Sequence, residues 1–258
     1  GESKGRSALI WKNSLVHLKK FSGGAVQFKN INELWLEQFQ NYLLKKVSPN
    51  TASVYYGKVR SSLQRAVRDR IISKNLGNIK PEETEIEFLT FEEIKQLSLN
   101  LPEDISSQQV AKMFLFSCYT GLSIANLLSL TFKQIEGNKV GFFREKTKTW
   151  HYVELNKTAL ALVGDTANCQ PSAKVFTTLN YHQCLYRLQK WGKKAGIPKK
   201  LKFHLGRHTF ATLSLTQGVD LYTVQKLIGH KKLATTQIYA KVIDSVKRKA
   251  VDALPQLE

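Results

Sequence analysis

The hydrophobic positions of the first 70 residues recur every three or four residues, which is the spacing of amphipathic helices. Three helices are predicted, over residues 7–21, over residues 32–46, and from Ser48-Pro49 to about Arg70, because serine followed by proline is typical of a helix start. The side chains expected to face inward are Leu9, Ile10, Leu15, Val16, Leu18, Leu34, Trp35, Phe39, Leu43, Val54, Tyr55, Val59, Leu63 and Val67. The pattern therefore predicts a small all-α bundle at the start of the chain.

The pattern after residue 86 mixes helices with two short strands. Thr90 and Glu93 predict a capping box that starts a helix running through Leu97. The runs 139–143 and 150–155 are aromatic and β-branched and flank a polar Lys-Thr-Lys-Thr turn, which indicates a β-hairpin. Further helices are predicted over residues 107–119, from there to about 130, and over 159–163, 181–194, 206–217 and 222–228, with a short one bearing Tyr239. This part is expected to be an α+β domain, mainly α with a small antiparallel sheet.

Charge density changes near Pro81 and suggests a domain boundary there. Residues 1–80 hold 15 Lys plus Arg against 4 Asp plus Glu, a net charge of +11, whereas the rest of the chain holds 24 against 16, a net charge of +8. The stretch Lys80-Pro81-Glu82-Glu83-Thr84-Glu85 is polar and locally acidic, which is typical of an exposed linker. We therefore predict a helical domain over residues 1–80, a linker over 81–86 and a second domain over 87–258.

A formal net charge of +19 on 258 residues favours association with polyanions, and nucleic acid is the first partner class to expect. A ribosomal or heparin-binding protein would carry the same charge, so charge alone does not indicate chemistry. No run of 18 apolar residues is present, which excludes an obvious membrane span. Cys118, Cys169 and Cys184 are odd in number and lack metal-ligand spacing, so we expect reduced thiols in a cytoplasm and no structural metal.

Cations are concentrated on the third predicted helix. They are Lys58, Arg60, Arg65, Arg68 and Arg70. Their density suits phosphate contacts along a DNA groove, although a solvated helix face would carry the same charges.

Three short segments near the carboxyl end suggest chemistry on a phosphate. His204-Leu205-Gly206-Arg207-His208 is followed by Leu227-Ile228-Gly229-His230 and then by Tyr239. On a helix, His204 and Arg207 lie three residues apart and share one face, where both can reach a single phosphate. Arginine offers a forked, permanently charged donor, and histidine adds a donor or a proton near neutral pH. Gly229 is also a candidate left-handed helix cap, in which case a polar residue after it is unremarkable.

These segments resemble the tyrosine recombinases, also called phage-type integrases. HLGRHTFAT at 204–212, LIGH at 227–230 and TTQIYA at 235–240 match the motifs of that family, and CYTGLSIANLLSLTFKQI at 118–135 resembles the segment that carries its first catalytic arginine. Ser123 occupies the position of that arginine.

The resemblance implies a role for each matching residue. Tyr239 would be the nucleophile that forms a 3′-phosphotyrosyl bond, with Arg207, His204 and His230 on the phosphate and His204 assisting proton transfer. Lys146 would be the general acid, with Lys148 as the rival candidate and otherwise a DNA-binding side chain. No metal, cofactor or ATP is implied. His208 follows Arg207 directly, so we expect it to point away from the shared face and stay outside the catalytic set.

The serine at position 123 is the main departure from the family pattern, because it cannot supply the charge of an arginine that clamps phosphate. Arg144 is our candidate substitute, since on an extended strand it projects to the same face as Lys146. The alternative is that Arg144 is an ordinary surface charge.

The resemblance also implies how the whole chain works. The first domain would clasp duplex DNA opposite the catalytic domain, and a tetramer would assemble on paired double-stranded attachment sites with accessory DNA-bending proteins. The helix after Tyr239 would pack on a neighbouring protomer or back on its own domain. Ser123 and its surroundings look most like integrases of conjugative transposons from Bacteroides-type hosts; that group commonly carries an additional N-terminal arm-binding domain, and this chain starts too late to include one. The expected location is the bacterial cytoplasm, at the nucleoid.

The leading interpretation is thus a site-specific recombinase that integrates or excises a mobile element. Two alternatives stay open at this stage: a catalytically weak DNA-binding accessory with the same fold, suggested by Ser123, and a type IB topoisomerase that relaxes DNA alone. Neither the target sequence nor the preferred direction can be read from the sequence, because base readout depends on which side chains reach the groove edges.

Overall fold

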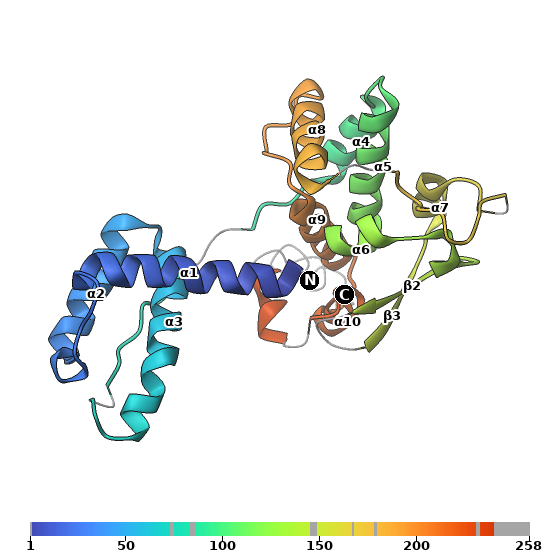
Figure 1. The fold of residues 1–258 in the computed structure, drawn as a ribbon. Coiled ribbons are helices and arrows are strands. Elements are labelled where there is room, and N and C mark those ends of the chain that lie inside the picture. The colour runs from blue at the N-terminus through green and yellow to red at the C-terminus, as the bar shows by residue number, and fades with distance from the viewer. Residues whose placement is uncertain are drawn as a thin grey trace, which may run out of the picture. The chain divides into compact units, whose positions relative to one another are not determined.

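The computed structural model describes residues 2–72, 75–82, 86–144, 149–166, 168–177, 180–230 and 233–239. The chain divides into two compact units, Gly1–Glu85 and Ile86–Glu258, whose elements are drawn in Figure 1. Each unit has its own hydrophobic core. The two units are therefore considered one at a time.

The first unit is an all-α bundle, as predicted. Its helices are α1 (Glu2–Ser22), α2 (Glu33–Lys46) and α3 (Pro49–Arg68), with a short 3-10 helix at Phe28–Asn30. Phe39, Leu43 and Tyr56 are almost fully buried at its centre. The chain after α3 returns along the bundle, where the Tyr56 hydroxyl donates to the carbonyl of Leu76. The bundle is thus closed by an extended segment as well as by its helices.

Several side chains expected to face inward lie at the surface instead. They are Leu9 at 55% exposure, Leu15 at 49%, Val16 at 42%, Leu34 at 62% and Val54 at 46%. Each helix position is rotated by about 100° from the one before, so Leu34 and Leu36 lie about 200° apart and cannot both face one core. The bundle buries Leu36. The sequence predicted the three helices, although α1 begins five residues earlier than expected, and it placed Leu34 rather than Leu36 in the core.

Helix α3 ends two residues before the predicted position. Arg70 has a φ of 58°, the left-handed region that glycine usually occupies after a helix. The N–H of Arg70 donates to the carbonyl of Val67 at 3.1 Å, and the N–H of Ile71 donates to Ala66 at 2.9 Å. This pair of bonds is a Schellman cap, and it satisfies carbonyls that the helix end would otherwise leave unpaired.

The second unit is mainly helical around one central helix. Its helices are α4 (Phe91–Leu99), α5 (Ile105–Thr120), α6 (Ile124–Ser129), α7 (Lys157–Val163), α8 (Tyr181–Lys194), α9 (Phe203–Thr216) and α10 (Leu221–Ile228), with 3-10 turns at Phe132–Gln134, Leu233–Thr235 and Gln237–Tyr239. Helix α5 is apolar on nearly all sides and packs against α7, α8 and α9. A helix that is apolar all round belongs in a core, which is where α5 lies.

The predicted capping box at the start of α4 is confirmed. The N–H of Thr90 donates to Oε2 of Glu93 at 2.8 Å, and the N–H of Glu93 donates to Oγ1 of Thr90 at 3.2 Å. These reciprocal bonds satisfy two N–H groups that have no partner within the helix.

The predicted hairpin is present within a three-stranded antiparallel sheet of order β1-β2-β3. The strands are β1 (Ile135–Glu136), β2 (Lys139–Arg144) and β3 (Thr149–Glu154), and β1 was not anticipated. Val140 pairs with Val153, and both are buried, whereas Phe143 pairs with Trp150 on the exposed face. The turn between β2 and β3 lies outside the described residues.

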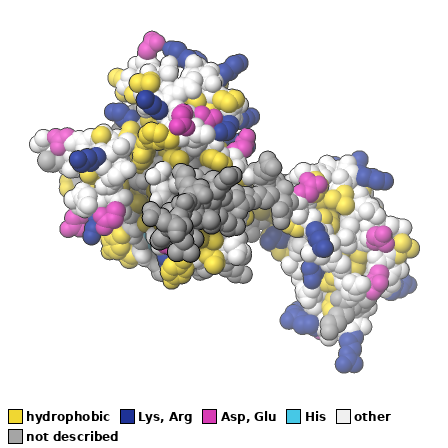
Figure 2. All heavy atoms as spheres, turned by 180° about the vertical axis from the view of Figure 1, so that it is seen from behind, with side chains coloured by type: hydrophobic (Ala, Val, Ile, Leu, Met, Phe, Trp, Pro, Cys, Tyr) yellow, Lys and Arg dark blue, Asp and Glu magenta, His cyan; other side chains and the backbone are white. Residues whose placement is uncertain are grey.

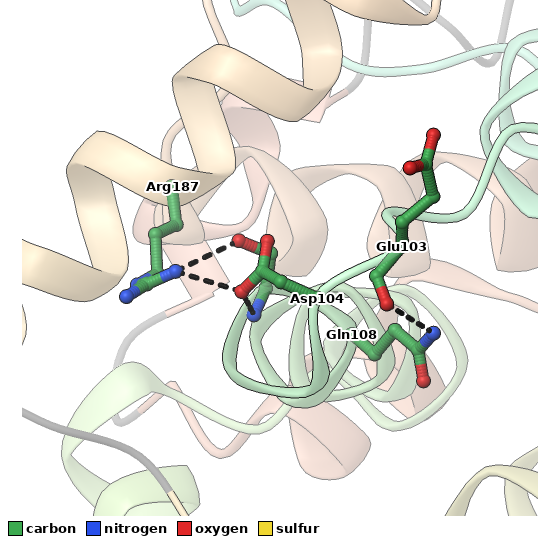
Figure 3. A network of polar contacts seen from close by, with 5 residues as sticks. Glu103, Asp104, Gln108 and Arg187 are labelled. Atoms are coloured by element: carbon green, nitrogen blue, oxygen red, sulfur yellow. Dashed lines mark hydrogen bonds and ion pairs between the residues drawn. The ribbon is translucent and has the colours of Figure 1, made fainter.

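A polar contact ties α8 to the start of α5 (Figure 3). Nη1 of Arg187 donates to Oδ1 of Asp104 at 2.9 Å and to the hydroxyl of Ser107 at 3.1 Å. Asp104 also caps α5 by accepting from the N–H of Ser107, and hydrogen bonds from Ser107 together with the Arg187 charge lower the pKa of Asp104. This contact joins the middle of α8 to the first turn of α5.

Candidate active site

Arg207 lies where three helices meet. A glycine precedes it, and a Cβ at Gly206 would lie 3.0 Å from Cβ of Ser117, so glycine permits the close packing of α9 on α5. The Arg207 side chain is only 8% exposed. Its Nη1 donates to the carbonyl of Gly121 at 2.7 Å, and its Nη2 donates to the carbonyl of Ile228. The guanidinium thus links the carboxyl ends of α5 and α10, where helix carbonyls carry partial negative charge.

Both helix ends that contact Arg207 terminate at a glycine in the left-handed conformation. Gly121 has a φ of 66° and Gly229 has a φ of 61°. The left-handed cap that the sequence suggested at Gly229 is therefore present. These caps turn the chain sharply at the two carbonyls that hold the guanidinium.

His204 and His208 stack one helical turn apart on α9. Their ring centroids are 4.3 Å apart in an edge-to-face arrangement. His204 is exposed to solvent, whereas His208 is half-buried. Burial of its inner edge, with a further contribution from Arg207, lowers the pKa of His204.

The expectation that His208 points away from the shared face is wrong. His208 follows Arg207 by one position, but it also follows His204 by four, and residues four apart on a helix lie on the same face. The spacing of four between His204 and His208 was visible in the sequence, and it could have shown that the two histidines share a face.

Tyr239 is buried and meets His208. Its side chain is 1% exposed and packs with Ala211, Leu215, Val224 and Ile228. The Tyr239 hydroxyl lies 2.7 Å from Nδ1 of His208, and the two ring centroids are 5.6 Å apart. The nucleophile candidate is therefore in direct contact with a histidine, although not with the one that the sequence motif indicated.

The protonation states at this contact follow from burial. Burial raises the pKa of Tyr239 to about 12, and the charge of Arg207 acts in the opposite direction. Burial, with the charges of His204, Arg207 and His230, lowers the pKa of His208 to about 4. At neutral pH the tyrosine hydroxyl is therefore protonated and the imidazole is neutral. With the hydroxyl as donor, Nδ1 is the acceptor and the ring proton is assigned to Nε2.

His230 lies directly after the cap of α10 and anchors the segment that carries Tyr239. Its Nδ1 is 3.0 Å from the hydroxyl of Thr236, and its carbonyl accepts from Nε2 of Gln225 at 2.9 Å. Thr236 is fully buried, and its carbonyl accepts from the N–H of Tyr239 at 3.0 Å. Arg207, His204 and His230 thus lie around His208, which contacts the tyrosine hydroxyl.

Ser123 lies near this cluster but performs a local task. It is the N-cap of α6, with its hydroxyl 2.5 Å from Oδ1 of Asn126 and 3.4 Å from the N–H of the same residue. Ser123 is two positions after Gly121, whose carbonyl holds Arg207. Position 123 therefore borders the arginine site, and its serine stabilises a helix start.

The hairpin cations fall largely outside the described part of the chain. Arg144 ends β2 and pairs through its backbone with Thr149, but its side chain is not among the described atoms. Lys146 and Lys148 lie outside the described residues. Their positions relative to Arg207 stay predictions.

The cations of α3 lie on its outer face. Arg60, Arg65 and Arg68 are exposed, as is Arg70 beyond the helix end, and Arg65 lies 3.9 Å from Asp69 in an exposed pair. The Lys58 ammonium lies 5.2 Å from the ring centroid of Trp11, so it packs partly against α1. Figure 2 shows Lys and Arg side chains at the surface of both units.

Three further observations concern metal sites, membrane spans and a surface pocket. Among the described residues, no group of three or more His, Cys, Asp or Glu side chains is arranged to hold a metal ion. No helix in the described ranges is long and apolar enough to cross a membrane. A surface pocket between α5 and α8, lined by Asp104, Tyr186, Arg187 and Trp191 among others, shares no residue with the Arg207 cluster.

Comparisons with known proteins identify relatives over most of the chain. Residues 87–245 match the Phage integrase family, and residues 2–80 match the Phage integrase SAM-like domain. The chain is 37% identical over 139 residues to "Tyrosine recombinase XerA" of Saccharolobus solfataricus, which covers 52% of this chain and 47% of that protein. The chain spans about half the length of the first curated relatives that it matches.

Two solved structures share the fold. The XerH site-specific recombinase bound to palindromic difH substrate, in a post-cleavage complex, matches 95% of this chain and 78% of its own, with a TM-score of 0.72 and 17% identity. The Tn1549 transposon integrase in complex with transposon right end DNA matches 96% of this chain and 94% of its own, with a TM-score of 0.71 and 14% identity. At such identities the likeness concerns the fold alone.

Proposed function

The chain belongs to the Phage integrase family, and on that premise we propose that it cleaves and rejoins DNA strands through a 3′-phosphotyrosyl intermediate on Tyr239. The observation that carries the proposal is that Arg207, His204 and His230 lie around His208, whose Nδ1 is in contact with the buried Tyr239 hydroxyl. Arg207 and His204 come from α9 and His230 comes from the turn after α10, and the tyrosine follows ten residues after Gly229.

The proposed step conserves the phosphodiester energy. The Tyr239 oxygen forms a bond to phosphorus, the bond between phosphorus and the 5′-oxygen breaks, and the hydroxyl proton of the tyrosine passes to His204. Arg207, with His204 and His230, stabilises the negative charge of the five-coordinate phosphorus. A 5′-hydroxyl of a second strand can reverse the step and reseal the DNA, so that no ATP is needed.

The departing 5′-oxygen needs a proton. We assign this role to Lys146, with Lys148 as the rival, because a hairpin ammonium beside DNA can have its pKa lowered toward the working range. Single-turnover cleavage by Lys146→Met and by Lys148→Met, compared with a substrate whose leaving group needs no proton, separates the two. The activated substrate should restore cleavage only in the variant that lacks the general acid.

We propose that Arg144 replaces the family's first catalytic arginine, whose position is occupied here by Ser123. Ser123 borders Gly121, whose carbonyl holds Arg207, so a cation arriving from the hairpin could share the same phosphate. We expect Arg144→Gln to lose at least about 10³-fold in cleavage rate, judged from arginines that clamp transferring phosphoryl groups elsewhere, and Ser123→Arg to restore part of that loss.

A control is needed for this exchange, because Ser123 also caps α6. Ser123→Ala removes the cap without adding charge and should cost about 1 kcal/mol of stability with no rescue of Arg144→Gln. If Ser123→Arg rescues no better than Ser123→Ala, Arg144 does not occupy the role of the missing arginine.

The first unit is proposed to be the DNA-clamping domain. Its exposed Arg60, Arg65 and Arg68 are placed to meet phosphates along one face of α3, with Lys58 and Arg70 beside them. Assembly would be a tetramer on paired duplex attachment sites, with accessory DNA-bending proteins, at the nucleoid of a bacterial cytoplasm. The resemblance of the segment around Ser123 is the basis for proposing a mobile element, in particular a conjugative transposon, as the DNA that is integrated or excised.

The proposal is tested by trapping the covalent intermediate. The protein is incubated with a pool of nicked duplexes of randomised sequence, in which cleavage releases a short strand and cannot be reversed. Adducts are recovered and sequenced, and mass spectrometry identifies the modified peptide. We expect phosphotyrosine at residue 239, with no adduct in Tyr239→Phe and an undiminished yield in Tyr222→Phe, an exposed tyrosine on α10.

The same assay separates the alternatives. Absence of any adduct in the wild-type protein, with DNA binding intact, would indicate a catalytically weak accessory protein. Relaxation of supercoiled DNA without paired sites would indicate a topoisomerase.

A further inference from the structure

Tyr239 is almost fully buried, whereas a nucleophile must reach a phosphate at the protein surface. His204 is exposed, His208 is half-buried one turn further along α9, and Tyr239 is 1% exposed. The tyrosine hydroxyl contacts His208 and not the exposed His204. One turn of α-helix spans about 5.4 Å. The nucleophile candidate therefore contacts the histidine that lies one helical turn along α9 from the exposed one.

The Arg207 guanidinium is engaged in the same state. Two of its nitrogens donate to the carbonyls of Gly121 and Ile228, and the side chain is 8% exposed. Ile228 also packs against the Tyr239 ring in the same apolar cluster. The burial of Tyr239 and the hydrogen bonds of Arg207 to the two carbonyls therefore occur together in this structure, with Ile228 taking part in both.

The His208 contact supplies what the buried hydroxyl requires. A phenol placed among Ala211, Leu215 and Val224 needs a hydrogen-bond partner, because an unpaired buried hydroxyl is costly. Nδ1 of His208 accepts that bond at 2.7 Å. His208 is a poor final acceptor for the tyrosine proton itself, since an imidazolium there would lie beside Arg207 and the His204 ring.

We propose that His208 is a positioning residue that holds the Tyr239 hydroxyl in a withdrawn state, and that strand cleavage requires the hydroxyl to pass from His208 to the level of His204 and Arg207. This inference rests on the proposed function for the cleavage step. The hold itself is a property of the protein without DNA, so it can be measured independently.

The decisive comparison is between two substitutions at position 208. His208→Asn retains a polar group at the position of Nδ1, where its amide oxygen can accept from Tyr239. His208→Leu has a similar size but no acceptor. Loss of the hydrogen bond should shift the tyrosine outward by about 5- to 30-fold in population, the range that one to two kcal/mol corresponds to.

The measurement without DNA is the rate of tyrosine nitration by tetranitromethane, followed peptide by peptide with mass spectrometry. We expect Tyr239 to react about 5- to 30-fold faster in His208→Leu than in the wild-type protein, and within about twofold of wild type in His208→Asn. Tyr222 is 60% exposed and is the internal standard, whose rate should not change.

The measurement with DNA is the single-turnover cleavage rate on a sequence recovered from the nicked pool. The rate in His208→Leu should equal or exceed that of the wild-type protein, with unchanged DNA affinity. Equal nitration of Tyr239 in all three proteins would overturn the proposal, and so would a fall in cleavage by His208→Leu, because the contact would then be needed in the reaction.

Two controls keep the outcomes distinct. Thermal melting establishes that each variant is folded, and His208→Ala, which also has no acceptor, replaces the leucine variant if that protein does not fold. Failure of wild-type protein to form any adduct contradicts the proposed function, whereas the nitration result tests the His208 contact alone.

Discussion

At the scale of single residues, the site depends on side chains that pair with backbone and with each other. Arg207 is held by two carbonyls at helix ends, and Tyr239 is held by one imidazole nitrogen. Both of these buried polar side chains have specific partners, as the low-dielectric interior favours. The charges around His208 make its protonation state a sensitive report on this arrangement.

The depressed pKa of His208 predicts a loss of stability as the pH falls. In the unfolded chain histidine gains its proton near a pKa of about 6.5, whereas in the folded protein the pKa of His208 is about 4. Between these values the unfolded state binds the additional proton, so the free energy of unfolding decreases as the pH falls through this window. Urea denaturation at pH 7 and at pH 4.5 should show wild-type protein losing about 2 kcal/mol more than His208→Asn.

The comparison of two proteins cancels the titration of the other groups, including Asp104 and Asp220, whose lowered pKa values also reduce stability in acid. Identical pH dependence of the two proteins would show that His208 takes up its proton as readily in the folded state as in the unfolded state.

At the scale of elements, the ends of helices decide where the site residues lie. Helix α5 ends at Gly121, whose carbonyl accepts from Arg207. Helix α10 ends at Gly229, directly after Ile228, whose carbonyl also accepts from Arg207. Helix α3 stops at a similar left-handed residue, but there the residue is Arg70. Glycine adopts this left-handed geometry without strain, whereas a residue with a side chain is strained in it.

Substitution of the glycine that ends α5 should be costly. Gly121 has a positive φ, and a Cβ there would lie 2.6 Å from Cδ1 of Phe210. We expect Gly121→Ala to lower the free energy of unfolding by about 2–4 kcal/mol, from backbone strain of about 1 kcal/mol together with overpacking. Gly137→Ala is the matched control, because Gly137 has a similar φ and no atom within 4 Å of the added Cβ. Equal losses in urea denaturation would mean that the Phe210 contact does not matter.

Arg70 offers the reverse experiment on α3. Arg70→Gly should raise the stability of the protein by about 0.5–1 kcal/mol, because glycine adopts the left-handed cap without strain. The same change should weaken DNA binding if Arg70 contacts phosphate, so stability and affinity should move in opposite directions. Arg68→Gly, inside the helix, should lower both stability and affinity. A melting temperature that falls in Arg70→Gly would contradict the cap argument.

At the scale of the whole molecule, a formal net charge of +19 is divided unequally between the two units, and the smaller unit carries the denser charge. Its exposed arginines lie on one face of α3, opposite the side chains that build the bundle core. Such a face is suited to sequence-independent binding of the DNA backbone.

Salt dependence tests this use of charge. Each phosphate contact contributes about 0.9 to the slope of log affinity against log salt concentration, so replacing Arg60, Arg65 and Arg68 by Gln should reduce the slope by as much as about 3. Fluorescence anisotropy with a duplex probe over a range of salt concentrations provides the slope. Lys95→Gln is the control, because this exposed lysine lies on α4 next to Glu92 and Glu93. A slope that is unchanged in the triple variant would remove α3 from the DNA interface.

The sequence predicted most elements of this molecule, because the signals for them are local. The capping box of α4 involves residues three positions apart, and α8 spans Tyr181–Lys194 as its spacing predicted. The motifs around His204 and His230 are also short. By contrast, Leu34 was placed in the core and Leu36 was not, since two apolar residues near each other on a helix satisfy the same pattern.

What the sequence alone determined, then, is the set of elements, the family motifs and the excess of positive charge, because these arise between neighbouring positions or from composition. Only the tertiary structure decided that Tyr239 meets His208, 31 positions away, and that Arg207 meets the carbonyl of Gly121, 86 positions away. The physical reason is that each contact forms where separate helices pack, and packing depends on the shape of the whole core rather than on any local spacing.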